Sequence, residues 1–253
     1  MRVALFIPCY IDQLYPHVGI AALRLLEHFH AGNVEFPTEQ ICCGQPMANA
    51  GCAADARPAA ERFVATFRPY DYIVAPSGSC VAMIRNHYHG LVADETALTE
   101  VQGKTFELCE FLTDVLQAEP PSGRFPSRVG LHQSCHGLRE LRLGSSSELA
   151  VPPFDKIGAL LSRLEGIEFV SLERPDECCG FGGSFAIYEE AVSCMMGQDR
   201  IADHERAGAE VLTAADMSCL MHLDGLIRRQ RRPLRVLHVA ELLAEAMGLS
   251  LKA

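Results

Sequence analysis

The pattern of apolar and polar positions predicts alternating strands and helices, and it predicts them twice. Each half opens with a short apolar run that ends on a cysteine, at residues 2–9 and at residues 128–135. Apolar runs of this length are typical of buried strands. We expect residues 1–9 to form a buried first strand rather than a signal peptide. Pro8 and Cys9 follow the apolar run too closely, and no small-residue cleavage site comes after them.

The later elements also recur in both halves. Apolar residues at helical spacing predict a first helix in each half, and β-prone residues predict a second strand after it. The predicted pairs are helices at 19–28 and 157–164, strands at 34–36 and 167–170, helices at 53–67 and 189–207, strands at 71–75 and 209–213, and closing amphipathic helices at 107–116 and 236–247.

This alternation predicts an α/β fold made of two pseudo-symmetric repeats. Each repeat is expected to be a small, mostly parallel sheet flanked by helices. The first repeat spans residues 1–118 and the second spans residues 128–253. Residues 119–127, which begin with a proline- and glycine-bearing stretch, are the expected linker. Duplication of one unit is the simplest explanation of such a repeat.

Eight cysteines occupy matched positions in the two repeats. In each repeat, one cysteine follows the first strand, an adjacent pair followed by glycine comes after the second strand, and one follows the third strand. These are Cys9, Cys42, Cys43 and Cys80 in the first repeat, and Cys135, Cys178, Cys179 and Cys219 in the second. The carboxyl ends of parallel strands lie at the same edge of a sheet, so each set of four is expected to converge.

Soft thiolate ligands select iron–sulfur clusters, zinc or monovalent copper. Adjacent cysteines reach two different metal atoms only if the backbone turns sharply, and Gly44 and Gly180 permit such a turn. This arrangement favours one or two iron–sulfur clusters per chain. Zinc in closed tetrahedral sites is the alternative, although structural zinc sites usually have short C-x-x-C spacings.

Composition narrows the class of protein further. The chain has 253 residues and 11 cysteines but no recognisable secretory signal, which favours a reducing compartment and metal use over disulfides. Cys52, Cys109 and Cys194 have no counterpart in the other half, and we expect them to be ordinary small side chains. The net charge of −10 argues against nucleic-acid binding, and no apolar run is long enough for a transmembrane helix.

The repeated pattern C…CCG…C resembles the cysteine-rich CCG-domain family, which includes the B subunit of heterodisulfide reductase. In that family a C-x-x-C pair closes each set of ligands. Here its first cysteine is replaced by Ser77 in the first repeat and by Asp216 in the second. Asp216 is therefore a candidate extra metal ligand, and Ser77 is expected to hydrogen-bond its loop.

The loops at 42–46, 76–80, 178–183 and 216–220 resemble the lactate-utilisation branch of this family. That resemblance implies an iron–sulfur electron-transfer subunit, of [4Fe-4S] type, in a complex that oxidises L-lactate to pyruvate. It also implies two partners, a ferredoxin-like iron–sulfur subunit and a third small subunit. The expected location is cytoplasmic, with possible attachment to the inner membrane through those partners. Glycolate oxidase-type subunits, cluster-based disulfide reductases and a zinc-stabilised, partner-binding scaffold remain the alternatives.

Three histidines lie near the cysteines in sequence: His132 and His136 flank Cys135, and His222 follows Cys219. A histidine beside a cluster can ligate metal, donate a hydrogen bond to sulfur or carry a proton, whereas a solvated or structural role is the ordinary one. The chain has no phosphate-binding loop, nucleophile elbow, or flavin or nicotinamide motif. No catalytic residue is therefore assigned from the sequence.

Overall fold

The computed structural model describes residues 1–29, 31–119 and 121–251 and contains two four-stranded sheets. The first half consists of β1 (Arg2–Leu5), α1 (Cys9–Leu14), α2 (Pro16–His28), β2 (Asn33–Glu35), α3 (Gln45–Asn49), α4 (Ala53–Phe67), β3 (Tyr72–Ala75), α5 (Gly78–His87), α6 (Glu95–Gln102), β4 (Thr105–Glu107), α7 (Leu108–Glu110) and the π-helical turn η1 (Phe111–Val115). The second half consists of β5 (Arg128–Leu131), the π-helical turn η2 (His136–Glu140), α8 (Lys156–Leu161), β6 (Glu168–Phe169), α9 (Phe185–Tyr188), α10 (Glu190–Arg206), β7 (Val211–Ala214), α11 (Met217–Gln230), β8 (Arg235–His238) and α12 (Val239–Ala246).

Both sheets are parallel throughout and have the same strand order. The first is β2-β1-β3-β4 and the second is β6-β5-β7-β8. Equivalent residues pair in the same register, with Ala4 opposite Ile73 in one sheet and Gly130 opposite Leu212 in the other. The predicted α/β fold with two parallel repeats is confirmed. The stretch proposed as the linker, residues 119–127, follows η1 and ends immediately before β5.

The structure corrects two local expectations. The predicted closing helix at 236–247 is wrong over its first residues, because Arg235–His238 forms the fourth strand β8 beside β7. In the first half β4 ends at Glu107, and the helix that follows passes into the π-helical turn η1. The expected loops before Cys80 and Cys219 are also shorter than predicted. Ser77 and Asp216 act as N-caps, so α5 and α11 begin directly after them.

The two halves pack together through equivalent pairs of helices. Helix α2 packs against α12, and the equivalent helices α8 and α7 also pack against each other. Lys156 of α8 forms an ion pair with Asp114 of η1 across this contact. Buried residues of both halves belong to one continuous apolar cluster. Helices of each half therefore pack against helices of the other half and contribute to a shared core.

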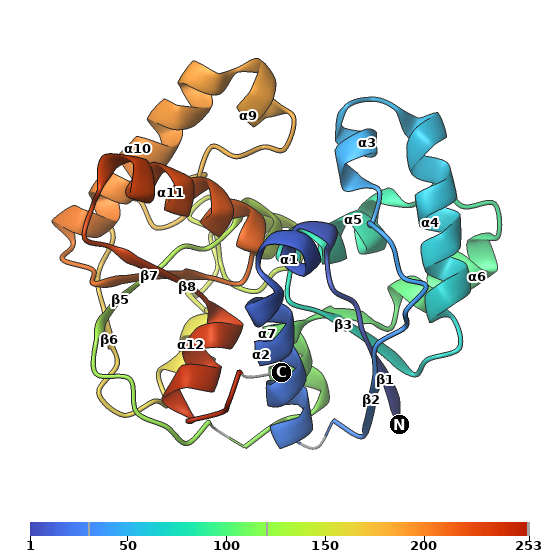
Figure 1. Cartoon of the computed structure of the whole chain (residues 1–253), viewed down its shortest axis with the longest axis horizontal. Coiled ribbons are helices and arrows are strands. Elements are labelled where there is room, and N and C mark those ends of the chain that lie inside the picture. Colours follow the sequence, from blue (N-terminus) through green and yellow to red (C-terminus); the bar gives the residue numbers. More distant parts are fainter. Residues whose placement is uncertain (30, 120, 252–253) are drawn as a thin grey trace.

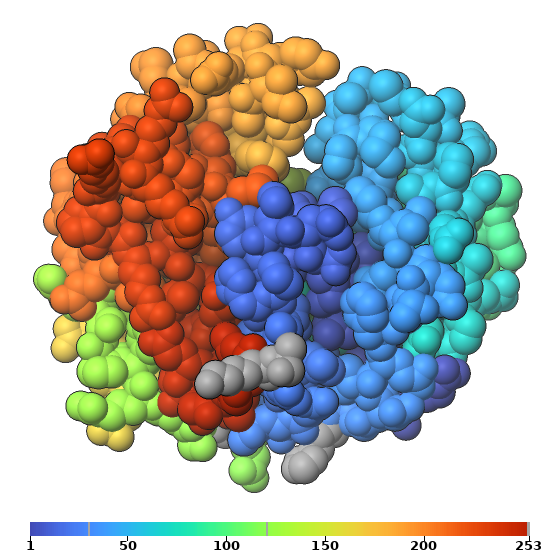
Figure 2. Space-filling model, viewed as in Figure 1, coloured from blue at the N-terminus to red at the C-terminus, as the bar shows by residue number. Residues whose placement is uncertain are grey.

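Two helical segments stand above the sheets (Figure 1). One is α3 with α4, from the first half, and the other is α9 with α10, from the second. Figure 2 shows a notch in the surface between these segments. Across it, the backbone at Gly183 approaches the side chain of Asn49, since a Cβ at Gly183 would lie 3.6 Å from Asn49 Nδ2. Within the described ranges, no helix is both long and apolar enough to cross a membrane.

Candidate metal centres

All eight repeated cysteines lie where a strand gives way to a loop or helix at one edge of its sheet. Cys9 begins α1, four residues after the end of β1, and Cys135 is the N-cap of η2. The adjacent pairs occupy the loops that follow β2 and β6. Cys80 and Cys219 lie in the first turns of α5 and α11, where burial holds the side chains in place.

In the first half the four thiols form two contacting pairs, which a contact between Cys42 and Cys43 joins into one group. The sulfur of Cys9 lies 3.7 Å from that of Cys42, and the sulfur of Cys43 lies 3.3 Å from that of Cys80. The backbone N–H of Gly44 donates to the Cys42 sulfur at 3.4 Å. Gly44 has φ of 82°, a conformation that favours glycine, so the turn that separates the two neighbouring thiols depends on this residue.

The second half repeats this geometry. The backbone N–H of Gly180 donates to the Cys178 sulfur at 3.4 Å, as its counterpart does in the first half. Gly180 has φ of 87°, and a Cβ there would lie only 2.6 Å from the carbonyl oxygen of Ser193. The thiol of Cys178 contacts those of Cys135 and Cys179. Cys179 in turn contacts Cys219, so the four thiols again form a connected group.

These contacts make one sulfur in each half the most readily ionised. Hydrogen bonds from Cys43 and Cys9, together with the N–H of Gly44, lower the pKa of Cys42 to about 3. Hydrogen bonds from Cys135 and Cys179, together with the N–H of Gly180, lower the pKa of Cys178 to about 2. A thiolate is the form that binds metal. Each half therefore presents a preorganised anionic sulfur at its centre.

The distances between the sulfur atoms indicate which kind of metal centre the thiols can hold. Four sulfurs around one zinc ion at about 2.3 Å lie about 3.8 Å from one another in every pair. The pairwise contacts of 3.7 and 3.3 Å match that edge length. Within the described part of the chain, however, no three ligand atoms of the first half lie within 4.8 Å of one another. Two pairs of thiols in this half therefore have the spacing of a zinc site, whereas the four thiols as a set are more widely spread.

One compact group of three potential ligand atoms does occur in the second half. It comprises His132, Cys179 and Cys219, all buried, whose ligand atoms lie within 4.8 Å of one another. His132 Nδ1 accepts a hydrogen bond from Arg200 at 3.1 Å, while its Nε2 has no hydrogen-bond partner among the described residues. Burial lowers the pKa of His132 well below its ordinary value. The sequence indicated His132 only by its nearness to Cys135, and it gave no sign of the contact with Arg200.

Asp216 and Ser77 link the two halves. Asp216 Oδ2 accepts the backbone N–H of Ser79, and Oδ1 accepts the hydroxyl of Ser218, at 2.7 and 2.8 Å. The Ser77 hydroxyl caps α5 and lies 2.8 Å from the hydroxyl of Tyr10. Ser77 and Asp216 also form an antiparallel bridge with each other. Both carboxylate oxygens of Asp216 are thus engaged within the protein.

The remaining candidates have separate surroundings. His136 Nε2 lies 3.4 Å from the side-chain amide of Gln45, which brings the first half's CCG loop against the second half's first cysteine. His222 Nε2 lies 3.2 Å from the carbonyl oxygen of Ser193. The three unmatched cysteines lie apart from both groups of thiols: Cys52 is exposed before α4, Cys109 is buried in α7 and Cys194 is half-buried on α10.

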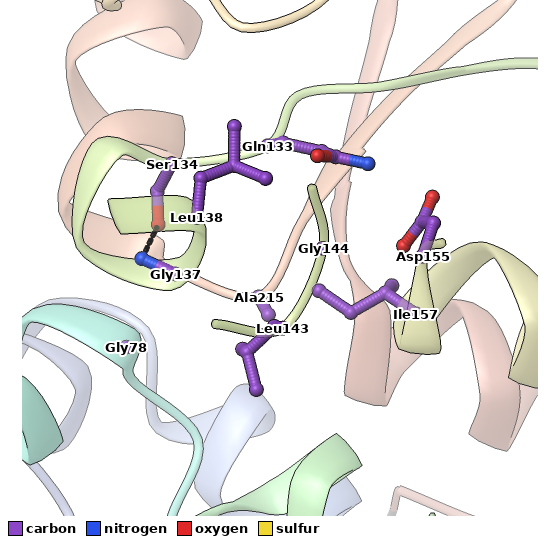
Figure 3. Close-up of a pocket in the computed structure, with 10 residues that line it drawn as sticks. All are labelled: Gly78, Gln133, Ser134, Gly137, Leu138, Leu143, Gly144, Asp155, Ile157 and Ala215. Atoms are coloured by element: carbon purple, nitrogen blue, oxygen red, sulfur yellow. Dashed lines mark hydrogen bonds between the residues drawn. The ribbon is translucent and has the colours of Figure 1, made fainter. Parts of the chain in front are cut away.

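A small, mainly apolar cavity lies between the halves, behind the segment that carries Cys135 (Figure 3). Gly78 borders it from the first half, and Ser134, Gly137 and Leu143 border it from the second. The Ser134 hydroxyl accepts the N–H of Gly137 at 3.1 Å, which fixes the turn after Cys135. No cysteine lines this cavity. The cavity is therefore separate from both groups of thiols.

Comparisons with known proteins agree with this duplicated arrangement. The model of the family described as "Cysteine-rich domain" (CCG) matches residues 3–85 and again residues 129–224. A protein named "Lactate utilization protein A" from Exiguobacterium sp. is 39% identical over 97% of this chain and 98% of its own length. The protein of the same name from Halalkalibacterium halodurans is 38% identical over 96% of both chains.

Among solved structures, a hypothetical protein from Helicobacter pylori has a TM-score of 0.63 at 11% identity. The match covers 98% of this chain and 49% of that protein, and it shows a shared fold. The sequence relatives, by contrast, align over nearly their whole length. The chain belongs to the lactate utilization protein A family, whose members it matches over nearly their whole length.

Proposed function

We propose that this chain is an iron–sulfur electron-transfer subunit of an oxidoreductase complex that converts L-lactate to pyruvate. One centre is held by Cys9, Cys42, Cys43 and Cys80, and the other by Cys135, Cys178, Cys179 and Cys219. The observation that carries the proposal is the repeated set of four thiols with a glycine N–H on the central sulfur. The names of the end-to-end relatives supply the substrate.

The residues present suit clusters of [4Fe-4S] type. Such a cluster, when bound, accepts and passes on single electrons. The chain's own residues hold it, shield it and tune it. Cys43, Cys80, Cys179 and Cys219 are buried and exclude water from one side, while Cys9 is exposed at the surface. Gly44 and Gly180 direct N–H groups at the thiolates, which stabilises negative charge on sulfur.

Partner subunits are part of this proposal. Lactate releases two electrons at once, and clusters pass one at a time, so another centre must divide the pair. The surface beside the second CCG loop offers a docking site, because Ile187, Tyr188 and Met195 are 77%, 79% and 63% exposed on α9 and α10. The proposed partners are a ferredoxin-like iron–sulfur subunit and a third small subunit. We propose a cytoplasmic complex that reaches the inner membrane through them.

A zinc-stabilised scaffold is the second candidate, and the thiol contacts of 3.3 and 3.7 Å favour it. Measuring iron, zinc and acid-labile sulfide in anaerobically purified protein distinguishes the zinc scaffold from the electron-transfer subunit. We expect iron and sulfide in nearly equal amounts and a brown absorbance that bleaches on reduction. Zinc without sulfide would overturn the electron-transfer proposal.

Two exposed cysteines provide a matched pair of variants. Cys9→Ser removes a proposed ligand, whereas Cys52→Ser changes an exposed cysteine outside the repeated set. We expect the first variant to lose about half of the iron and sulfide and the second to retain all of it. Equal iron content in the two variants would contradict the assigned ligands.

The substrate is tested with the assembled complex. L-lactate is added anaerobically to this chain alone and to this chain with its partner subunits, and cluster bleaching is followed. We expect bleaching only with the partners present, and faster with L-lactate than with glycolate. If glycolate bleached the cluster in the assembled complex and L-lactate did not, the chain would be assigned to the glycolate-oxidising type instead.

A further inference from the structure

The two halves differ most in the side chains packed beneath their CCG loops. In the first half this position holds three fully buried aromatic rings, Phe6, Phe63 and Phe67, with Phe6 centred 5.0 and 5.6 Å from the other two. The repeat places His132 where Phe6 stands, since each lies three residues before the first cysteine of its half.

The long helices after the CCG loops give the other two equivalences. Gly44 packs on Ala59 of α4, and Gly180 packs on Met196 of α10. Counting from these contacts, Arg200 stands where Phe63 does, and His204 stands where Phe67 does. All three substituted side chains are buried to at least 99%. Equivalent positions thus carry a buried aromatic cluster in the first half and a buried polar cluster in the second.

Arg200 is held firmly by its surroundings. It forms an ion pair with Asp203 at 3.2 Å and donates to the carbonyl oxygens of Arg174 and Pro175. Asp203 is itself fixed by the backbone N–H groups of Glu173 and Arg174, both at 3.1 Å. The remaining donor of the guanidinium, Nε, points at His132 Nδ1. Arg200 therefore fixes the orientation of the imidazole ring.

This contact also fixes which nitrogen of His132 carries hydrogen. A guanidinium group donates and never accepts, so Nδ1 must present its lone pair to Arg200. The ring hydrogen then resides on Nε2. That atom has no partner among the described residues. It belongs to a ring that offers a ligand atom within 4.8 Å of the sulfurs of Cys179 and Cys219. An N–H donor is consequently aimed at the sulfur side of the second centre.

We propose that His132 donates a hydrogen bond to a sulfur of the cluster held by the second half, and that Arg200 positions it. This inference rests on the proposed function. A hydrogen bond to sulfur stabilises the reduced, more negative state and raises the reduction potential. The first half has Phe6 in this place and lacks the donor. This hydrogen bond therefore raises the potential of the second cluster above the value it would have without the donor.

The same geometry argues against His132 as a metal ligand. Ligation through Nε2 requires a lone pair there, and a ligating histidine usually donates its other N–H to an acceptor. Here the other nitrogen faces a donor. With both nitrogens serving as acceptors the ring would have to be an anionic imidazolate. His132 is accordingly a positioning residue that tunes the cluster rather than a fourth or fifth ligand.

The test is a potentiometric titration of the holoprotein followed by electron paramagnetic resonance. His132→Leu removes the donor, whereas His132→Gln keeps both an acceptor for Arg200 and an N–H donor for sulfur. Phe6→Leu is the matched control in the first half. We expect one of the two midpoint potentials to become more negative in His132→Leu, to be largely restored in His132→Gln, and to be unchanged in Phe6→Leu.

Three results would overturn the inference. One is unchanged potentials in His132→Leu at full iron and sulfide content, and another is an equal shift of both midpoints. The third is strong nitrogen hyperfine coupling in the native protein that His132→Gln abolishes, since it would show direct ligation. Absence of iron and sulfide in the native protein would instead contradict the proposed function, so the two failures are distinguishable.

Discussion

At the scale of single residues, equivalent positions in the two halves carry different chemistry on the same backbone. Glu107 and His238 both end the fourth strand of their sheet and both cap the helix that follows. Each is almost completely buried. Burial raises the pKa of Glu107 to about 8 and lowers the pKa of His238 to about 4. Both side chains are therefore uncharged near neutral pH.

Glu107 gives the fold a pH dependence that one substitution removes. The folded chain keeps a proton that the unfolded chain releases above its ordinary pKa of 4.5, so stability falls as pH rises from 4.5 to about 8. Glu107→Gln keeps the capping acceptor and removes this loss. We expect it to be more stable than the native chain by up to about 3 kcal/mol at pH 7.

Urea unfolding at a series of pH values measures this effect. The difference between native and variant must become small well below pH 4.5, where the carboxyl group is protonated in both states. A constant offset at every pH would indicate a packing effect and contradict the electrostatic explanation.

At the scale of elements, the pattern of the sequence predicted the alternation of strands and helices but not every boundary. Helix α4 spans the predicted residues 53–67, because its apolar face is regular. Strand β8 was read as the start of a helix, since Val236 and Leu237 continue the apolar positions of α12. A three- or four-residue strand carries too few positions to display its own period.

The candidate ligands were predictable because cysteine at a strand end is chemically conspicuous. The contact between His132 and Arg200 was not, because it joins β5 to α10 across 68 residues and depends on how closely the helix approaches the sheet. Gly130 permits that approach, since a Cβ there would lie 2.1 Å from His204 Nδ1. The equivalent residue of the first half is Ala4, in a sheet that packs against aromatic rings instead.

Gly130→Ala tests this approach of helix to strand. The added methyl group must displace α10 or the buried ring of His204, and we expect a loss of about 3 kcal/mol in the free energy of unfolding. Gly225→Ala is the matched control in α11, where a Cβ meets nothing within 4 Å. We expect a gain of about 1 kcal/mol there. Thermal or urea unfolding measures the free energy of unfolding of both variants. Equal changes in the two would contradict close packing of the helix against Gly130.

At the scale of the whole molecule, the contacts between the halves centre on Asp216. Its carboxylate caps α11 in its own half and accepts both the N–H and the hydroxyl of Ser79 from the other. Gly78 N–H adds a bond to the carbonyl oxygen of Ala215, at 3.3 Å. These are short-range links between the first turns of α5 and α11, which carry Cys80 and Cys219, so they fix the relative placement of the two groups of thiols.

Asp216→Ala should therefore cost more than the loss of a helix cap. It leaves buried donors of Ser79 without an acceptor, and we expect a loss of about 3 kcal/mol in the free energy of unfolding. Asp94→Ala is the control, because Asp94 caps α6 at the surface by accepting the N–H of Ala97. We expect about 1 kcal/mol there. Similar losses in the two variants, measured by urea unfolding, would contradict a role for Asp216 in joining the halves.

The packing of helices between the halves, α2 on α12 and α8 on α7, suggests how the chain arose. A single repeat would leave these apolar faces open to water. Two copies of that repeat close them by equivalent contacts, and the equivalent residues Ser77 and Asp216 pair with each other, as at an isologous interface. The one-repeat ancestor is therefore expected to have been a homodimer with two identical centres. In a single fused chain, one copy can carry His132 and Arg200 while the other carries Phe6 and Phe63 at the equivalent positions.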